Sequence, residues 1–288
     1  MQYLESFTLA SEDQEWEFFV KEAKSRAYTD YYPFQLFPNK DVPTLRFADV
    51  TILYGNNGAG KSTLLNVMAE KLGLTRNALY NRSAFFGSYL ARCDYQLASP
   101  VPEGSAIISS DEIFNYMLDT RALNQGIDAK RDEMFADYLD HKFGTFQYHD
   151  LSDYDELKKT LETRRKTQSR YVREHLHKNV TERSNGESAL AYFDHKLQDN
   201  HLYLLDEPEN SLSPSHQQAL VELIGQSARF FGCQFIIATH SPFVLALPGA
   251  KIYDLDHAPV VVRPWSELPE VRVFADFFKA HAREFEQD

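Results

Sequence analysis

The chain has 288 residues, 43% of them hydrophobic, and a formal net charge of −12. This composition supports a globular protein with a large core, and the acidic balance argues against a protein that coats nucleic acid with its whole surface, although a local basic patch is compatible with it. The apolar runs are far shorter than the roughly 20 residues of a membrane span, and the N-terminal segment lacks the basic start and apolar core of a signal peptide, so we expect a cytoplasmic protein with no membrane partner.

The first forty residues leave two alternatives open. In residues 11–27 the apolar positions favour either an amphipathic helix or a strand and turn. Three prolines between residues 33 and 43 then predict an irregular, extended segment that contains the aromatic run Tyr31–Phe34.

The strongest motif is Gly55–Ser62, with the sequence Gly-Asn-Asn-Gly-Ala-Gly-Lys-Ser. A buried strand, Val50–Tyr54, is expected before it and a helix, Ser62–Leu72, after it, which is the context of a phosphate-binding loop. Glycines let backbone N–H groups turn towards phosphate oxygens, and the helix N-terminus adds partial positive charge. The residues expected to bind nucleotide here are Asn56, Asn57, Gly58, Ala59, Gly60, Lys61, Ser62 and Thr63.

Within this loop two side chains have specific expected roles. Lys61 would reach the β- and γ-phosphates, and the Ser62 hydroxyl would ligate Mg²⁺. An aromatic residue from 31–34 could stack on adenine, but in so aromatic a chain core packing is the commoner fate.

Between residues 85 and 123 the pattern predicts a helix, a strand and a second helix. Apolar residues keep helical spacing from Phe85 to Leu97, and Ala106–Ile108 reads as a short strand. The second helix is expected from Asp111 to Leu123, capped by Ser110 or Asp111. Its buried side is predicted to comprise Ile113, Phe114, Met117 and Leu118.

A helical insert is expected to follow. Gly126, Gly144 and Ser152 separate two further predicted helices, near Asp128–Lys142 and Tyr154–Lys178. We therefore predict a single domain over residues 1–288 with a helical subdomain at about 109–183. This insert is too short for a long antiparallel coiled coil.

The segment Glu156–Lys178 is locally basic, with a net charge of +5. A solvated helix face is the simpler explanation, and a surface that contacts a phosphate backbone is the functional alternative. Arg170 and His175 also have the spacing seen in one class of ribonucleases, a short pattern that recurs by chance.

The last hundred residues contain further motifs. Ser184–Ser188 opens a predicted helix, for which an ordinary N-cap is the simplest role of Ser184. A buried strand, His201–Glu207, ends in the carboxylates Asp206 and Glu207. A helix is expected over Pro214–Phe231 and a buried strand over Gln234–Thr239, directly before His240. The tail predicts strands near 251–255 and 260–262 and a helix over about 268–284.

The two cysteines, Cys93 and Cys233, do not suggest a disulfide framework. Cys233 stands at the head of an apolar strand, which favours a small buried thiol. No cluster of Cys and His has metal-site spacing.

Together, the loop at 55–62, the segment 184–188, the acidic pair 206–207 and His240 resemble the ATP-binding-cassette class of P-loop ATPases. Ser184 lies 22 residues before Asp206, and His240 lies 34 after it. The wording of the motifs is closest to the soluble, non-transporter branch, which holds predicted bacterial AAA family ATPases related to DNA-repair and phage-defence ATPases. The resemblance covers residues 45–72 and 182–262. It implies an α/β fold with a mainly parallel sheet flanked by helices.

The resemblance also implies a role for each motif. Asp206 would hold Mg²⁺ together with Ser62, Glu207 would polarise the attacking water, and His240 would contact the γ-phosphate. Glu207, His240 and Lys61 are thus the expected catalytic residues. Ser184, Gly186 and Glu187 would bind the γ-phosphate of the nucleotide held by a second subunit.

This last role predicts a homodimer that ATP drives together, because one chain completes neither site alone. There are two departures from the class. Its usual glutamine is replaced by Ser109-Ser110-Asp111, and Ser213 stands where transporters carry aspartate.

Three functions follow as alternatives. The first is an ATPase that couples closure of the dimer to a macromolecular partner, nucleic acid or an effector protein, in repair or phage defence. The second is the ATPase subunit of a membrane transporter, which the missing glutamine and the missing Leu-Ser-Gly-Gly signature argue against. The third is direct binding or cleavage of RNA by the basic helix 156–178.

Overall fold

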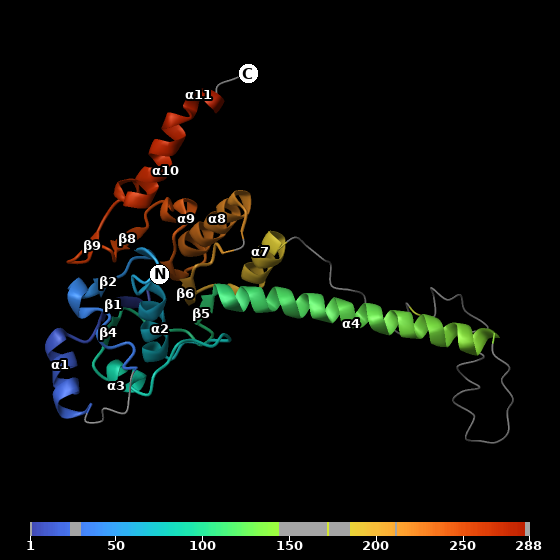
Figure 1. Ribbon diagram of the computed structural model, residues 1–288, viewed down its shortest axis with the longest axis horizontal. Helices are drawn as coiled ribbons and strands as arrows, with labels where there is room; N and C mark the ends of the chain where they lie inside the picture. The colour runs from blue at the N-terminus through green and yellow to red at the C-terminus, as the bar shows by residue number, and fades with distance from the viewer. Residues whose placement is uncertain (1, 24–29, 144–171, 173–184, 211, 286–288) are drawn as a thin grey trace. The chain divides into compact units, whose positions relative to one another are not determined.

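A computed structural model describes residues 2–23, 30–143, 172, 185–210 and 212–285, with the backbone alone at 141–143 and 185. The chain divides into two compact units (Figure 1). The first comprises Met1–Ile113 and Asn185–Asp288, and the second comprises Phe114–Ser184.

The first unit is built on a six-stranded sheet in the order β5-β6-β7-β3-β8-β9. Its strands are β3 (Val50–Tyr54), β5 (Ala106–Ser109), β6 (Leu202–Asp206), β7 (Gln234–Ala238), β8 (Lys251–Asp254) and β9 (Val261–Val262). All neighbours pair in parallel except β8 and β9. Strands β3, β6 and β7 are almost wholly apolar and buried, as strands covered on both faces must be. The predicted α/β class with a mainly parallel sheet is confirmed.

Helices cover both faces of this sheet because its crossovers run in opposite directions (Figure 1). Helix α2 (Lys61–Leu72) connects β3 towards β5, whereas α8 (Pro214–Phe230) connects β6 back to β7. Right-handed crossovers in opposite directions place their helices on opposite faces. Ser213 caps α8 by accepting from the backbone N–H of His216.

A smaller antiparallel sheet has the order β2-β1-β4. It consists of β1 (Leu4–Thr8), β2 (Leu45–Arg46) and β4 (Asp94–Leu97). Helix α1 (Glu12–Lys21) follows β1 with a capping box formed by Ser11 and Gln14, so the helical alternative holds there. A short 3-10 turn, η1 (Pro38–Lys40), lies in the proline-rich segment.

The predicted helix over residues 85–97 is wrong in its second half. Helix α3 covers only Phe86–Leu90, and Asp94–Leu97 pairs with β1 as strand β4. The residues of β4 are exposed or half-buried, so their apolar spacing does not mark a buried helix face. Backbone pairing with β1 decides the conformation instead.

The two helices predicted at 111–123 and 128–142 are one helix, α4 (Ser110–Phe143). Gly126 lies inside it, since a single glycine costs a helix only about 1 kcal/mol relative to alanine. The predicted buried side is half right: Ile113 and Met117 are buried, but Phe114 and Leu118 are 52% and 43% exposed. In the second unit Tyr138 packs with Val172. Apart from Val172, the predicted helix 154–178, with its basic and Arg/His patterns, lies outside the described residues.

The remaining elements follow the prediction closely. Helix α7 begins at Asn185 and ends at Lys196, and α9 (Pro242–Leu245) follows β7. The tail forms η3 (Trp265–Glu267), α10 (Pro269–Ala280) and α11 (Ala282–Phe285), with a break at His281 where one helix was expected.

The core of the first unit is rich in aromatic side chains. Phe18 and Phe34 stack with ring centroids 4.0 Å apart, and Tyr31 stacks on Phe85 at 5.0 Å. Cys93 and Cys233 are free, buried thiols, which confirms the prediction made for Cys233. None of the helices in the described ranges combines the length and apolar character that crossing a membrane requires.

Candidate phosphate-binding site

The loop Gly55–Ser62 joins the end of β3 to the start of α2, as the sequence predicts. Gly58 and Gly60 have φ values of +83° and +97°, a region that L side chains rarely adopt. Gly60 also lies against Phe37: a Cβ there would be 2.9 Å from Phe37 Cε1. The loop therefore needs glycine at Gly60 for both conformation and space.

Two residues that sequence reasoning missed hold the loop in place. The backbone N–H of Asn56 donates to Asp256 Oδ2 at 2.7 Å. Lys40 Nζ donates to the carbonyl oxygens of Ala59 and Leu255, at 2.8 and 2.9 Å. Both contacts join segments far apart in the chain, so no local pattern could have indicated them.

Lys61 is buried at the first position of α2. Its ammonium donates to the carbonyl of Gly55 at 2.7 Å and lies 2.5 Å from His240 Nε2. Burial lowers the pKa of Lys61, while the nearby carboxylates of Glu207 and Asp206 oppose that change. The charge of Lys61 thus sits at the inner edge of the loop.

Ser62 and Asp206 face each other. The Ser62 hydroxyl donates to Asp206 Oδ1 at 2.9 Å, from the start of α2 to the end of β6. Burial raises the pKa of Asp206 to about 6, with the Ser62 hydrogen bond opposing it. A half-buried carboxylate of this kind is stabilised by a cation, and oxygen ligands suit Mg²⁺, so this pair fits the ion. Within the described part of the chain, no group of three or more His, Cys, Asp or Glu could hold a metal ion.

Glu207 follows β6 in a strained conformation with φ +47°. Its N–H donates to the carbonyl of Ala238 at 2.9 Å, which ties it to the end of β7. Its Oε2 accepts from Asn210 Nδ2 at 2.9 Å, and its Oε1 lies 3.6 Å from His240 Nε2. One oxygen of the Glu207 carboxylate therefore faces His240, another predicted catalytic residue.

The sheet register explains why these residues meet. Asp206 is paired with Ala238 of β7, and Ala238 is also paired with Leu53 of β3. The loop, the acidic pair and His240 therefore leave three adjacent parallel strands at one edge of the sheet. Polar groups gathered at the carboxyl ends of parallel strands form the usual ligand site of open α/β sheets.

Glu209 is a further residue that the motif reading did not single out. It is buried, and its Oε1 accepts from the backbone N–H groups of His240 at 2.9 Å and Ser241 at 3.1 Å, and from the Thr239 hydroxyl. It therefore fixes the backbone on which His240 stands. The sequence could have indicated this role, because a glutamate between two buried strands requires hydrogen-bond donors for its carboxylate.

The start of α7 carries the residues that the resemblance assigns to the nucleotide of a second subunit. Ser184 lies outside the described residues, and Glu187 is exposed. Gly186 is buried against α8, where a Cβ would be only 2.5 Å from His216 Nδ1. Gly186 therefore packs on His216 of α8, which belongs neither to the phosphate loop nor to the strand ends that carry Asp206, Glu207 and His240.

The aromatic run upstream of the loop has divided roles. Phe34 is buried in the core, as its stacking on Phe18 shows, so core packing holds for it. Tyr32 instead reaches α2, with its hydroxyl 2.9 Å from Thr63 Oγ1.

Comparison with known proteins gives one family match. The family described as AAA domain, putative AbiEii toxin, Type IV TA system matches residues 107–246, from β5 through α9. No curated protein matches the sequence.

Several solved structures align over most of the chain. An inward-facing putative metal-chelate type ABC transporter aligns with TM-score 0.42 and 16% identity, over 96% of this chain and 89% of its own. The Smc head domain of Pyrococcus furiosus, bound to the C-terminal domain of ScpA, gives 0.43 and 14%, over 96% and 100%. The SMC head domain from Thermotoga maritima gives 0.36 and 16%, over 77% and 92%.

Proposed function

We propose that the chain is an ATP-binding-cassette-type P-loop ATPase that binds ATP with Mg²⁺ and hydrolyses it. One observation carries the proposal: at the ends of adjacent strands His240 contacts both Lys61 and Glu207, and Asp206 contacts Ser62. The match to an AAA domain supports the same assignment.

Each of these residues has a separate role in the proposal. The backbone of Asn56–Thr63 binds the phosphates, and Lys61 turns from the Gly55 carbonyl towards the β- and γ-phosphate oxygens. Glu207 orients and polarises the attacking water, and His240 contacts the γ-phosphate. Ser62 and Asp206 would hold Mg²⁺, which when bound neutralises charge on the phosphate oxygens.

The proposal includes a homodimer that ATP closes. Each chain has one phosphate loop and one Ser184–Ser188 segment, and a complete site needs the loop of one copy and the segment of another. Two copies related by a two-fold axis would therefore complete two sites. ATP that binds mainly the paired state shifts the equilibrium towards it, and hydrolysis releases it. Closure would act on a macromolecular partner, either nucleic acid or an effector protein. We propose a role in repair or phage defence from the resemblance of the motifs; the matched family is described as a putative AbiEii toxin of a Type IV TA system.

The test has two measurements on purified protein. The wild-type chain should release phosphate from ATP in the presence of Mg²⁺, and Lys61→Ala should abolish this because the phosphates lose their cation. Glu207→Gln should bind ATP without hydrolysing it and elute from a sizing column as a dimer. A Glu207→Gln protein that stays monomeric with saturating Mg²⁺ and ATP would refute the dimer, and a wild-type protein without activity in any oligomeric state would refute the ATPase.

A further inference from the structure

His240 is held by side chains from three other parts of the chain. Its Nε2 lies 2.5 Å from Lys61 Nζ and 3.6 Å from Glu207 Oε1. Its Nδ1 lies 3.6 Å from Glu270 Oε2, on the other side of the ring. Glu270 belongs to α10, outside every motif and outside the matched residues 107–246.

The contact with Lys61 indicates where the ring proton of His240 lies. An ammonium group has donors only, so the ring nitrogen that faces it at hydrogen-bond distance accepts. With Nε2 accepting, the proton of the neutral ring is on Nδ1, and Nδ1 is the nitrogen that faces the Glu270 carboxylate. The two contacts therefore favour the same tautomer.

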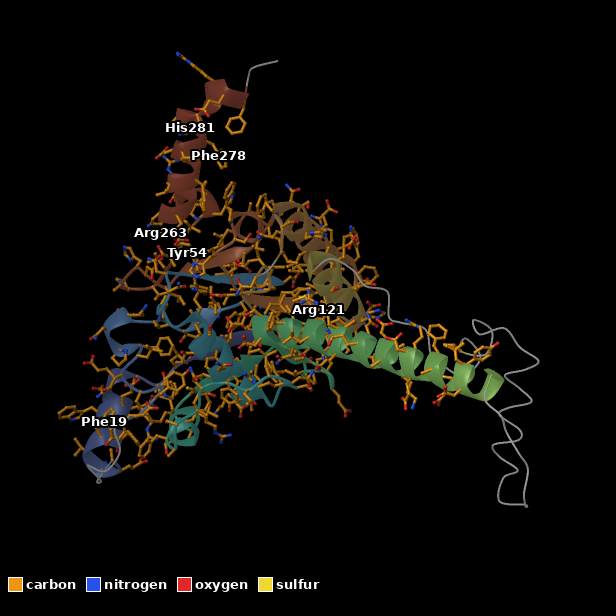
Figure 2. The ribbon with its side chains drawn as sticks, turned by 45° about the vertical axis from the view of Figure 1, so that its right-hand side comes forward. Phe19, Tyr54, Arg121, Arg263, Phe278 and His281 are labelled. Carbon is orange, nitrogen blue, oxygen red and sulfur yellow. The ribbon has the colours of Figure 1, made fainter. Side chains whose placement is uncertain are left out.

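The start of α10 is anchored firmly enough to place Glu270. The backbone N–H of Glu270 donates to the hydroxyl of Tyr54 at 3.4 Å, and Tyr54 is the buried last residue of β3, directly before the phosphate loop (Figure 2). Leu268 is fully buried and Val271 is 6% exposed, on either side of Glu270. Glu270 is thus fixed to the strand that carries the loop.

We propose that Glu270 is a positioning residue for His240: in the nucleotide-free protein it holds the proton on Nδ1 and the ring in place, so that Nε2 faces Lys61. Glu270 does not touch the reacting atoms and acts only through His240. The effect on hydrolysis rests on the proposed ATPase function, whereas the effect on the ring of His240 does not.

The first test reads the imidazole directly. The ring ¹⁵N chemical shifts of His240, assigned by the signal lost in His240→Gln, separate a nitrogen that carries a proton from one that does not. In nucleotide-free wild-type protein we expect the proton on Nδ1. Glu270→Ala should shift the Nδ1 signal, and Glu270→Gln, which keeps an acceptor oxygen, should restore it. Asp276→Asn removes an exposed acid of the same helix and should leave the spectrum unchanged.

The second test is kinetic. Glu270→Ala should lower kcat about tenfold, at the low end for loss of a group that orients an imidazole, with KM for ATP within about twofold. Glu270→Gln should recover most of the rate, and Asp276→Asn should not differ from wild type. An Nδ1 signal that ignores Glu270→Ala, a wild-type ring with its proton on Nε2, or an unchanged kcat in an active protein overturns the proposal. If the wild-type protein hydrolyses no ATP, the proposed function fails, and the spectra alone decide the role of Glu270.

Discussion

The buried carboxylate of Asp206 is suited to binding a cation, and without a cation its charge lowers the stability of the folded protein. Its pKa rises from 3.8 to about 6 because folding removes the carboxylate from water, and the hydrogen bond from Ser62 offsets only part of that cost. The folded state therefore holds the Asp206 proton more tightly than the unfolded state does. The contribution favours folding at low pH and is lost as the pH rises from about 4 to about 6.

This sign predicts that Asp206→Asn stabilises the protein when Mg²⁺ and nucleotide are absent. Asparagine keeps the shape without the charge, so the free energy of unfolding at pH 7.5 should increase by about 1–3 kcal/mol. Urea unfolding of both proteins at pH 7.5 and pH 4.5 measures this, and the difference should shrink at the lower pH. Asp276→Asn, an exposed acid, serves as the control. Equal stabilities of wild type and Asp206→Asn at pH 7.5 would contradict the prediction. The same variant should lose Mg²⁺-dependent ATP hydrolysis.

Among the elements, α7 and α8 pack at a point that allows only glycine. Gly186 lies so close to His216 that a Cβ would be 2.5 Å from its Nδ1, and His216 is itself held by Ser213 at 2.7 Å. Glu112, in the first turn of α4, contacts the other end of α7. Its Oε1 lies 3.7 Å from Lys196 Nζ and also accepts a hydrogen bond from the Tyr192 hydroxyl. Helix α7 is thus fixed at both ends within the first unit.

We therefore predict that Gly186→Ala is destabilising and that His216→Ala relieves it. The methyl group meets the imidazole, so Gly186→Ala alone should cost about 1–3 kcal/mol, the usual range for overpacking. In the double variant the ring is gone, and the coupling energy should be favourable by about 0.5–3 kcal/mol. Urea unfolding of wild type, the two single variants and the double variant gives the four free energies of this double-mutant cycle. Additive changes would show that α7 and α8 do not meet as described.

How far the elements could be predicted depended on what stabilises each of them. The strands that carry the loop and Asp206 are almost wholly apolar, so β3, β6 and β7 could be placed from sequence. Strand β4 could not, since it exists by pairing with β1 about ninety residues earlier. The predicted break in α4 at Gly126 failed because a single glycine rarely ends a long helix.

In the candidate site, the same distinction applies to single residues. Lys61, Ser62, Asp206 and His240 stand in motifs whose spacing is readable along the chain, and they meet in the structure. Asp256, Lys40 and Glu270 act from distant segments without a motif of their own. Only the folded sheet brings them to the loop, so no local pattern predicts them.

For the whole molecule, the proposed dimer makes a prediction that a monomeric ATPase does not. Each site would combine the phosphate loop of one copy with the Ser184–Ser188 segment of the other. Lys61→Ala therefore damages the phosphate loop that one copy gives to a site, and Ser184→Arg damages the segment that the other copy gives to it. Each variant alone should be inactive, because both of its sites contain a defect.

Mixing the two variants should restore activity. In a mixed dimer one site receives both defects, and the other receives a wild-type loop and a wild-type segment. With random pairing about half of the dimers are mixed and each has one intact site, so the rate should reach about a quarter of the wild-type rate. Phosphate release is measured at increasing ratios of one variant to the other, with a variant carrying both changes as the control that rescues neither. If the equal mixture is as inactive as its components, although sizing shows that mixed dimers form, the two segments do not share a site across the interface.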